Sequence, residues 1–384
     1  MDGVVSRSTA QAGRPVRLLL VNPSPVRGGA EELLLAFVTR CDPARVDPLV
    51  ACLAEGDFTD DLEAAGARVV RLRAGRLRHP WAWARTVARI ARLAREADAV
   101  LSWQVKGNYY GTPAARLART PCAWWDHGIR PARGEDRYLI DNVLPASVRA
   151  DLVVTSSAAA AARHRRARAI LPGIDLDPYA SPDRGRGRAL LGVPGQAPAI
   201  GIVGRLQPWK GQHVFLRAAA RIAATVPAAR FFVIGDAIGG FSASYPASLR
   251  SLAAEVGIAE RVAFLGQRPD VPALLPGLDV FVLASFDEPF GLVNVEAMAA
   301  GVPVVATNAG GVPEIVPSEE VGVLVPTGDD AAIADAVCSL LADPERAGSI
   351  AAAGRARAFE RFGIARFVED VTQLVEDLAE RGRG

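Results

Sequence analysis

The sequence is short of the residues that mark several large classes of protein. Although half of its 384 residues are hydrophobic, no apolar run approaches the roughly 18 residues that a membrane-spanning helix needs. The polar beginning MDGVVSRSTAQAGR also lacks the apolar core of a signal peptide. These absences predict a cytoplasmic protein, and its length suits two domains of ordinary size.

Cysteine and lysine are both scarce. The four cysteines are widely spaced, form no CxxC pair and have no His-rich partner, which argues against a disulfide framework or a zinc site. Of the 44 Lys and Arg residues, only Lys106 and Lys210 are Lys. A compact ammonium suits a point contact with a phosphate or sugar oxygen, so both are candidate ligand-binding residues. For Lys106, an accident of composition is an equally good explanation.

Net charge is also low. A formal charge of +2, spread along the chain, argues against nucleic acid as a partner. The one cluster, RHRRAR at Arg163–Arg168, could contact anionic lipid and so give a weak peripheral attachment to the inner membrane surface. A solvated, Arg-rich helix face is the alternative that we favour.

What the sequence has in abundance is alternation of short apolar runs with Ala/Arg/Leu stretches of helical period. This pattern predicts an α/β protein with parallel sheets. The expected strands are Arg17–Asn22, Pro48–Leu53, Arg68–Leu72, Ala99–Trp103, Cys122–Trp125, Asp151–Thr155, Ala169–Leu171, Ala199–Gly204, Arg230–Ile234, Arg261–Leu265, Asp279–Ala284, Pro303–Ala306 and Gly322–Val325.

A break between two sheets falls at LPGIDLDPYASPDRGRGR, which is rich in Pro, Gly and Asp and has no apolar period. We therefore expect domains at 1–174 and 175–360. The last segment, Ile364–Glu380, has an apolar stripe typical of a helix that docks on another element, and we expect 361–384 to return to the first domain. The stripe consists of Phe367, Val371, Leu374 and Leu378, with Val368 and Val375 beside it.

Ligands of open parallel sheets bind at the carboxyl ends of the strands, where GRLQPWKG is one candidate loop. Arg205 and Lys210 lie between an expected strand and a helix that begins near Gln212. Two cations and free helix N–H groups would suit a diphosphate. The loop is not a P-loop, and no GxGxxG follows the first strand. A solvated loop with incidental charges is the alternative.

The second candidate is SFDEPFGLVNVEAMAAGVPVV, in which Glu288 and Glu296 are eight residues apart. Pro289 and Gly291 shape a turn before a helix expected over Gly291–Ala300. Glu296, one turn into that helix, could accept hydrogen bonds from vicinal hydroxyls. A solvated helix face is the alternative. The loop amides that would face an anion belong to Phe290, Gly291 and Leu292.

These motifs together resemble family 4 of the retaining glycosyltransferases, the glycosyl transferases group 1, which have the GT-B fold. Glu288-x7-Glu296 is similar to its E-x7-E signature, GRLQPWKG to its GRL-x3-KG motif, and Arg27–Glu31 to its GGAE loop. The similarity of order and spacing extends from about Arg17 to Val325. It implies two Rossmann-like domains facing across a cleft, the first for the acceptor and the second for the donor, with a crossover helix at the C-terminal end.

The resemblance also implies roles for residues of the second domain. Arg205 and Lys210 would hold the donor diphosphate and stabilise the leaving nucleoside diphosphate. In this role the two cations would replace the metal that other transferases use. Glu296 would bind the ribose hydroxyls, and Glu288 the hydroxyls of the transferred sugar. The base would lie near Arg268–Val271.

For the first domain, the resemblance implies that Gly28 and Gly29 let a loop approach phosphate or acceptor closely. His127, at the end of an expected strand, would lie against the donor sugar, with Asp126 as a weaker neighbour. A histidine beside two tryptophans could instead be a satisfied structural residue. We find no obvious nucleophile for the retaining reaction, so Glu288 and His127 are candidates for electrostatic help.

Acceptor binding is the least determined part. Lys106, Asn108 and Tyr109 in SWQVKGNYYG follow an expected strand, and their mix of polar and aromatic groups suits a sugar or another polar ring. Packing at the start of a helix is an equal alternative. Nothing in the sequence identifies the acceptor, which could be a small molecule, a lipid or a glycan.

The prediction is therefore a metal-independent transferase that moves a hexose-type sugar from a UDP- or GDP-type donor to a hydroxyl. The rivals are another GT-B enzyme, such as an epimerase or a phosphorylase, and a non-catalytic nucleotide-sugar-binding protein. A phosphorylase should need pyridoxal phosphate on a lysine, and lysines are scarce.

Overall fold

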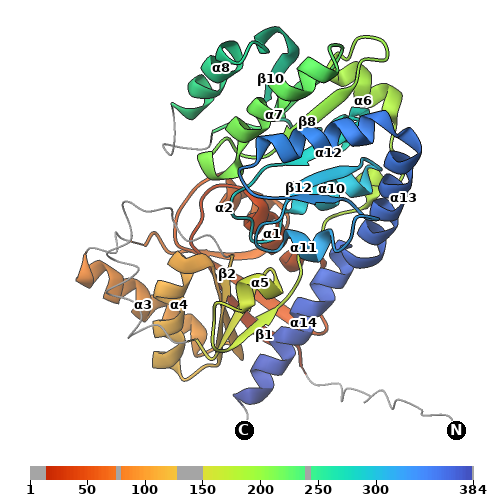
Figure 1. Cartoon of the computed structure of the whole chain (residues 1–384). Helices are drawn as coiled ribbons and strands as arrows, with labels where there is room; N and C mark the ends of the chain where they lie inside the picture. Colours follow the sequence, from red (N-terminus) through yellow and green to blue (C-terminus); the bar gives the residue numbers. More distant parts are fainter. Residues whose placement is uncertain (1–13, 75–78, 128–149, 238–243, 383–384) are drawn as a thin grey trace, which may run out of the picture. The chain divides into compact units, whose positions relative to one another are not determined.

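A computed structural model describes residues 14–74, 79–127, 150–237 and 244–382 (Figure 1). The chain divides into two compact units. The first unit comprises the described residues up to Asp126, together with residues 150–154 and 368–382. The second unit comprises His127 and the described residues within Thr155–Phe367. The predicted domain limits, 1–174 with 361–384 and 175–360, stay a prediction.

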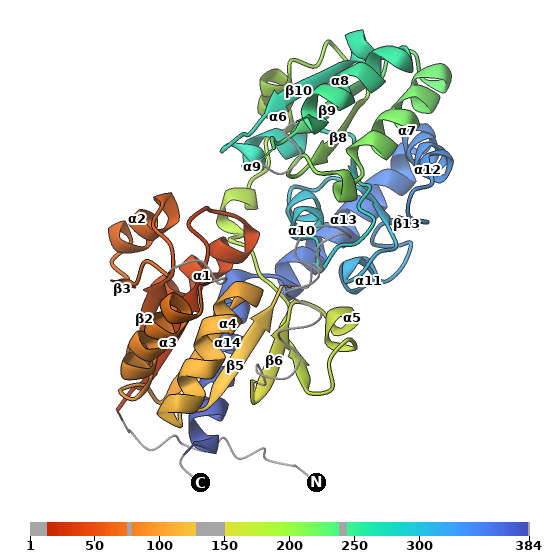
Figure 2. The ribbon, with the colours of Figure 1, turned by 90° about the vertical axis from the view of Figure 1, so that its left-hand side faces the viewer.

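The first sheet has seven strands in the order β3-β2-β1-β4-β5-β6-β7. The pairs from β3 to β5 are parallel, and β1 and β4 are almost wholly buried, as expected of strands covered on both faces. Helices α3 and α4 lie side by side along the sheet (Figures 1 and 2). The strands are β1 (Val16–Asn22), β2 (Val46–Cys52), β3 (Arg68–Arg71), β4 (Ala99–Trp103), β5 (Cys122–Asp126), β6 (Leu152–Thr155) and β7 (Ala167–Ala169).

The second sheet repeats this plan with six parallel strands in the order β10-β9-β8-β11-β12-β13. Two apolar cores pack on it: one includes Phe281, Met298 and Phe362, the other Phe215, Phe231 and Val282. The strands are β8 (Ala199–Val203), β9 (Arg230–Ile234), β10 (Val262–Gly266), β11 (Val280–Leu283), β12 (Val304–Thr307) and β13 (Val323–Val325).

Helices cover the sheets and connect their strands. Within the described ranges, every helix is too short or too polar to cross a bilayer. The helices are α1 (Gly29–Arg40), α2 (Asp57–Ala64), α3 (Pro80–Ala94), α4 (Gln104–Ala118), α5 (Ala158–Ala161), α6 (Arg184–Leu191), α7 (Gln212–Thr225), α8 (Tyr245–Glu255), α9 (Val271–Leu274), α10 (Leu292–Ala299), α11 (Val312–Ile315), α12 (Asp330–Ala342), α13 (Pro344–Arg361) and α14 (Ile364–Arg381). Short 3₁₀ turns are η2 (Asp177–Tyr179), η3 (Pro208–Lys210), η4 (Ala259–Arg261) and η5 (Leu275–Gly277).

The prediction of an α/β protein with two parallel sheets is confirmed, and all thirteen expected strands are present. Two local predictions were wrong. The seventh strand is Ala167–Ala169, two residues earlier than expected, and the Arg-rich segment before it is a turn rather than a helix face. The expected linker also contains a helix, α6.

The break between the two sheets lies where expected, between β7 and β8, but helix α6 within it was not predicted. Its sequence, RGRGRALL, has two glycines that disfavour a helix in isolation. Asp183 caps the helix, because its Oδ1 accepts a hydrogen bond of 2.9 Å from the Arg186 amide. A Cβ on Gly187 would lie 2.5 Å from the Gly277 amide nitrogen, so the absent side chain lets α6 pack closely against η5. Packing therefore outweighs the low helix propensity.

The last helix, α14, returns to the first unit from Val368 onward, as expected. The predicted apolar stripe is buried along its whole length. Arg45, just before β2, fixes the polar side: its guanidinium nitrogens lie 2.7 Å from Oε2 of both Glu369 and Glu376. The first unit is thus built from both ends of the chain.

Candidate functional site

The candidate site of the second unit lies at the point where the strand order of its sheet reverses. β8 and β11 are neighbours, but the chain leaves β8 toward β9 and leaves β11 toward β12. The two loops that follow these strands, 204–211 and 284–291, therefore emerge side by side, which is where open parallel sheets bind ligands. They are the two loops that the sequence marks as candidates.

Lys210 and Glu288 join these loops. Nζ of Lys210 lies 2.6 Å from Oε2 of Glu288, and the same oxygen accepts a 3.0 Å hydrogen bond from the Ser285 hydroxyl. The side chains are only 15% and 7% exposed, so the ion pair is largely withdrawn from water. The Phe286 amide donates to the Trp209 carbonyl at 2.8 Å and ties the backbones together.

Glycines bring two helix starts to this edge. Gly211, at the N-terminus of α7, has φ of 72°, and a Cβ there would lie 1.9 Å from the Ala284 carbonyl oxygen. Gly291, at the N-terminus of α10, has φ of 96°. Neither residue offers a side chain to cap its helix. The His213 amide of α7 donates to the Tyr245 hydroxyl at 3.4 Å, whereas the Leu292 and Val293 amides of α10 have no hydrogen-bond partner among the described residues and are available to an anion. With Lys210 beside them, these amides suit a diphosphate.

The other predicted residues of this site are more open. Arg205 is exposed and forms no ion pair with any described residue, while its carbonyl accepts a 2.9 Å hydrogen bond from Nε2 of Gln212. Glu296 is half-buried on α10. Burial, and secondarily the charge of Glu296, raise the pKa of Tyr179, so this carboxylate lies close to a buried phenol. Phe290, at 3%, is buried in the core below the loop.

An aromatic group formed by the loop after β11 and the start of α7 was not predicted. The rings of His213 and Phe286 are stacked, with centroids 5.6 Å apart, and Nδ1 of His213 lies 3.0 Å from the Tyr245 hydroxyl. Burial, and then the Arg217 charge, lower the pKa of His213. Phe286, two residues before Glu288 in the chain, is 44% exposed and offers an apolar face. The position of Phe286 in the loop after β11 is the sequence feature from which a site role could have been predicted.

Arg268, in the loop predicted to hold the base, forms an ion pair with Asp270. Its guanidinium binds Asp270 through two hydrogen bonds of 2.7 and 2.6 Å, which raise the pKa of Arg268 and lower that of Asp270. Val271 begins α9 directly after this pair.

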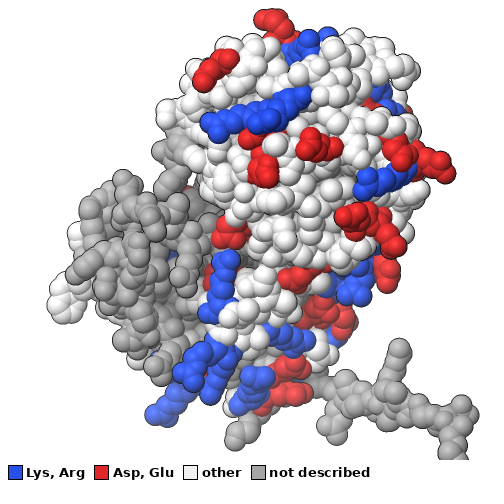
Figure 3. Space-filling model, in the orientation of Figure 1, with Lys and Arg blue, Asp and Glu red and all other residues white. Residues whose placement is uncertain are grey.

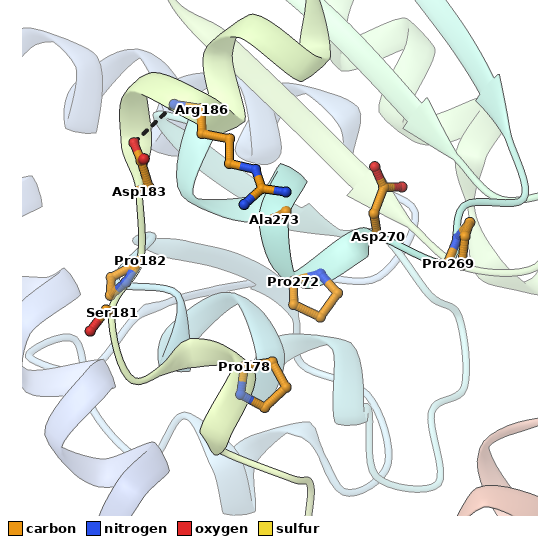
Figure 4. A pocket seen from close by; sticks show the side chains of 9 residues that line it. All are labelled: Pro178, Ser181, Pro182, Asp183, Arg186, Pro269, Asp270, Pro272 and Ala273. Atoms are coloured by element: carbon orange, nitrogen blue, oxygen red, sulfur yellow. Dashed lines mark hydrogen bonds between the residues drawn. The ribbon is translucent and has the colours of Figure 1, made fainter.

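Beside the Arg268 loop lies a cavity of about 290 Å³ (Figure 4). The side chain of Arg186 extends from α6 toward α9 across it. Four prolines make much of its wall rigid. The lining consists of Pro178, Ser181, Pro182, Asp183, Arg186, Pro269, Asp270, Pro272 and Ala273.

The first sheet has a matching arrangement at its own reversal point, after β1 and β4. Gly28 caps α1 and Gly29 is its first residue. Glu31, 5% exposed, accepts a hydrogen bond from Nε2 of Gln104, and a Cβ on Gly28 would lie 3.0 Å from Glu31 Oε2. Gln104 has φ of 58°, a strained value for a residue with a side chain. The sequence motif contained Glu31, but Gln104 carried no signal beyond its place after a strand.

The predicted acceptor residues are divided between surface and interior. Lys106 is exposed on α4. Asn108 is buried, and its Oδ1 accepts a hydrogen bond from the Thr112 hydroxyl at 2.5 Å. Tyr109 is also largely buried, and its carbonyl accepts from Nε1 of Trp83. Asp126 and His127 are half-buried at the carboxyl end of β5. Their roles in binding stay predictions.

The Arg-rich segment follows α5 and leads into β7, in a region where Figure 3 shows basic side chains gathered around α5. Arg163 lies 3.4 Å from Asp287, the residue before Glu288. At least one of these arginines therefore has a partner within the second unit.

Comparison with known proteins covers the same part of the chain. Residues 184–357 match the family model described as glycosyl transferases group 1, and this range contains both loops. The chain is 36% identical over 222 residues to the D-inositol 3-phosphate glycosyltransferase of Saccharomonospora viridis, covering 56% of this chain and 51% of that one. It is 41% identical over 187 residues to the Rhodococcus opacus protein of the same name, covering 48% and 42%. The chain thus spans about half the length of the curated relatives it matches.

Solved structures resemble the whole fold. The chain is similar to Anabaena HepE, whose structure was solved with UDP and glucose, with a TM-score of 0.81, 29% identity, and coverage of 94% of this chain and 99% of that one. The sucrose-phosphate synthase of Thermosynechococcus elongatus has a TM-score of 0.75 at 22% identity, covering 94% and 99%, and shares the fold. The two parallel-sheet units therefore form a GT-B fold, as predicted.

Proposed function

We propose that the chain transfers a hexose-type sugar from a nucleoside diphosphate donor to a hydroxyl group, because residues 184–357 match the family model of glycosyl transferases group 1 and the chain has the GT-B fold. The observation that carries this proposal is the Lys210–Glu288 pair between the uncapped starts of α7 and α10. One cation and the free amides at the start of α10 can bind a diphosphate, while a carboxylate beside them can bind sugar hydroxyls.

The other site residues take roles around this centre. Arg205, exposed and unpaired among the described residues, reaches the diphosphate with Lys210. Glu296 binds the ribose hydroxyls and Glu288 those of the transferred sugar. The base lies against the backbone of Arg268–Val271, because the Arg268 side chain is committed to Asp270. Gly28 and Gly29 give the first-unit loop a close approach to phosphate or acceptor.

The proposed reaction retains the anomeric configuration. The acceptor oxygen bonds to the anomeric carbon on the face that the diphosphate leaves, and the bond from that carbon to the diphosphate oxygen breaks. The departing diphosphate oxygen takes the acceptor proton. Lys210, Arg205 and the helix amides stabilise the charge that develops on the leaving group, so we propose that no metal is needed. His127 and Glu288 assist electrostatically.

The comparisons suggest which substrates to test first. UDP-glucose is the first donor, because a similar protein, HepE, was solved with it. D-inositol 3-phosphate is the first acceptor, because the similar curated proteins carry it in their name. The predicted cytoplasmic location and the weak contact of Arg163–Arg168 with a membrane surface stay predictions.

The test is a panel of UDP-, GDP-, ADP- and dTDP-sugars in thermal unfolding and in nucleotide-release assays without acceptor. A bound donor raises the unfolding temperature with concentration, and slow release of nucleoside diphosphate shows that the sugar bond is activated. If no nucleoside diphosphate or its sugar stabilises the protein, the proposal is wrong.

A further inference from the structure

Asn294, the third residue of α10, has a fully buried side chain. Neither its Oδ1 nor its Nδ2 has a hydrogen-bond partner among the described residues. Burying an amide without hydrogen bonds is unfavourable, and a native protein that keeps one needs an explanation beyond packing. Leucine would fill a similar volume without this cost.

The position of the amide points to its partner. A Cβ on Gly291 would lie 2.8 Å from Asn294 Nδ2 and 3.1 Å from Glu288 Cγ. The amide and the Glu288 side chain thus flank one small space that exists only because residue 291 is glycine. Glu288 receives both of its side-chain hydrogen bonds, from Lys210 and Ser285, on Oε2. Oε1 makes none with the described residues.

We propose that Asn294 is a positioning residue for Glu288, whose amide donates to Oε1 once the donor diphosphate engages Lys210. This inference rests on the proposed function. A diphosphate competes with Glu288 for the ammonium of Lys210, so the 2.6 Å ion pair weakens when the donor binds. Because Glu288 is only 7% exposed, water can compensate only partly for that contact, and a carboxylate that is left poorly supported would turn away from the sugar. Asn294 Nδ2 is the unused donor beside it.

The second polar atom of Asn294 fits the same assignment. At the third position of a helix, a side-chain acceptor can reach back to the backbone N–H of the capping residue. Here the capping residue is Gly291. Oδ1 held by that N–H would fix the plane of the amide and aim Nδ2 at Glu288. One side chain would then stabilise both the start of α10 and the sugar-binding carboxylate.

The test compares Asn294→Leu with Ser102→Ala. Ser102 lies in β4, is also fully buried, and its Oγ also lacks a partner among the described residues, so its variant controls for the removal of a buried polar group. The measurements are the unfolding temperature without ligand and the ratio of the Kd for UDP to the Kd for UDP-glucose, or the same ratio for whichever nucleotide and sugar the panel selects. We expect both variants to unfold at or above the wild-type temperature. Only Asn294→Leu should reduce the ratio, by about tenfold.

Each other outcome has a clear meaning. An unchanged ratio in Asn294→Leu overturns the role of Asn294, as does an equal loss of affinity for UDP and UDP-glucose, which a merely structural residue would give. If Asn294→Leu does not fold, Asn294→Ala, which removes the donor without adding apolar bulk, is measured instead, and a ratio unchanged from wild type overturns the inference. If the wild-type protein binds no nucleotide or nucleotide sugar, the proposed function fails and this inference fails with it.

Discussion

Replacing Lys210 with Met should strongly destabilise the second unit. The substitution leaves the Glu288 carboxylate, 7% exposed, with the Ser285 hydroxyl as its single side-chain donor among the described residues. Removing one partner of a buried ion pair costs about 3–5 kcal/mol, and the partial exposure of Lys210 favours the lower end of that range. For a unit of this size, about 3 kcal/mol corresponds to a fall of roughly 6–12 °C in unfolding temperature.

The assay is scanning calorimetry of four variants. Glu288→Gln should cost only about 1–2 kcal/mol, because Lys210 is the more exposed partner and also lies over the Trp209 ring, 4.3 Å from its centroid. The double variant Lys210→Met/Glu288→Gln should be more stable than Lys210→Met alone, since no buried charge remains unpaired. Lys106→Met, at the chain's other lysine, is the exposed control and should leave the unfolding temperature unchanged. A Lys210→Met protein as stable as this control would refute the reasoning, as would a double variant less stable than Lys210→Met.

Four further predictions follow from other features. Gly211→Ala should lower the unfolding temperature and abolish stabilisation by UDP, because a Cβ at residue 211 would lie 1.9 Å from the Ala284 carbonyl oxygen. Unchanged UDP binding would show that the close approach of Gly211 to Ala284 is not needed for the site. Burial raises the pKa of Asp98, but hydrogen bonds from two arginines outweigh it and lower the pKa to about 2. Above about pH 4 this carboxylate should therefore add roughly 2 kcal/mol to the free energy of unfolding, and this contribution is lost as the pH falls toward 2. Asp98→Asn should remove that pH dependence from the free energy of unfolding measured in urea. Glu296→Ala should weaken donor binding while Glu288→Ala mainly slows transfer in steady-state kinetics, and the opposite pattern would exchange their roles. EDTA should leave the rate of sugar transfer unchanged, whereas a loss that Mg²⁺ or Mn²⁺ restores would show that a metal takes part.

Strand positions were predictable because a buried parallel strand needs a continuous apolar run, which few other structures require. Ala99–Trp103 and Arg230–Ile234 match the structure at both ends. Helix α6 was not predictable, because its stability depends on Gly187 meeting Gly277, about 90 residues further along the chain. Local propensity contains no information on such a contact.

The site was predictable in its members but not in their mutual contacts. Lys210 and Glu288 each stood out in the sequence as a ligand for the donor, but their direct bond depends on β8 and β11 being neighbours in the sheet. The commitment of Arg268 to Asp270, and the burial of Asn108, likewise depend on rotamers and packing that a pattern of residue types does not specify. Gln104 was missed because its backbone strain appears only in three dimensions.

The return of α14 has a consequence for how the chain folds during synthesis. The first unit includes the buried Val371, Leu374 and Leu378 of α14. Arg45 forms its ion pairs with Glu369 and Glu376 only after α14 has been synthesised. A ribosome therefore releases the sheet of the first unit before it has made the helix that covers it, whereas the second unit, up to Phe367, can close earlier. The first unit, although most of it is translated before the second, should become resistant to protease after it.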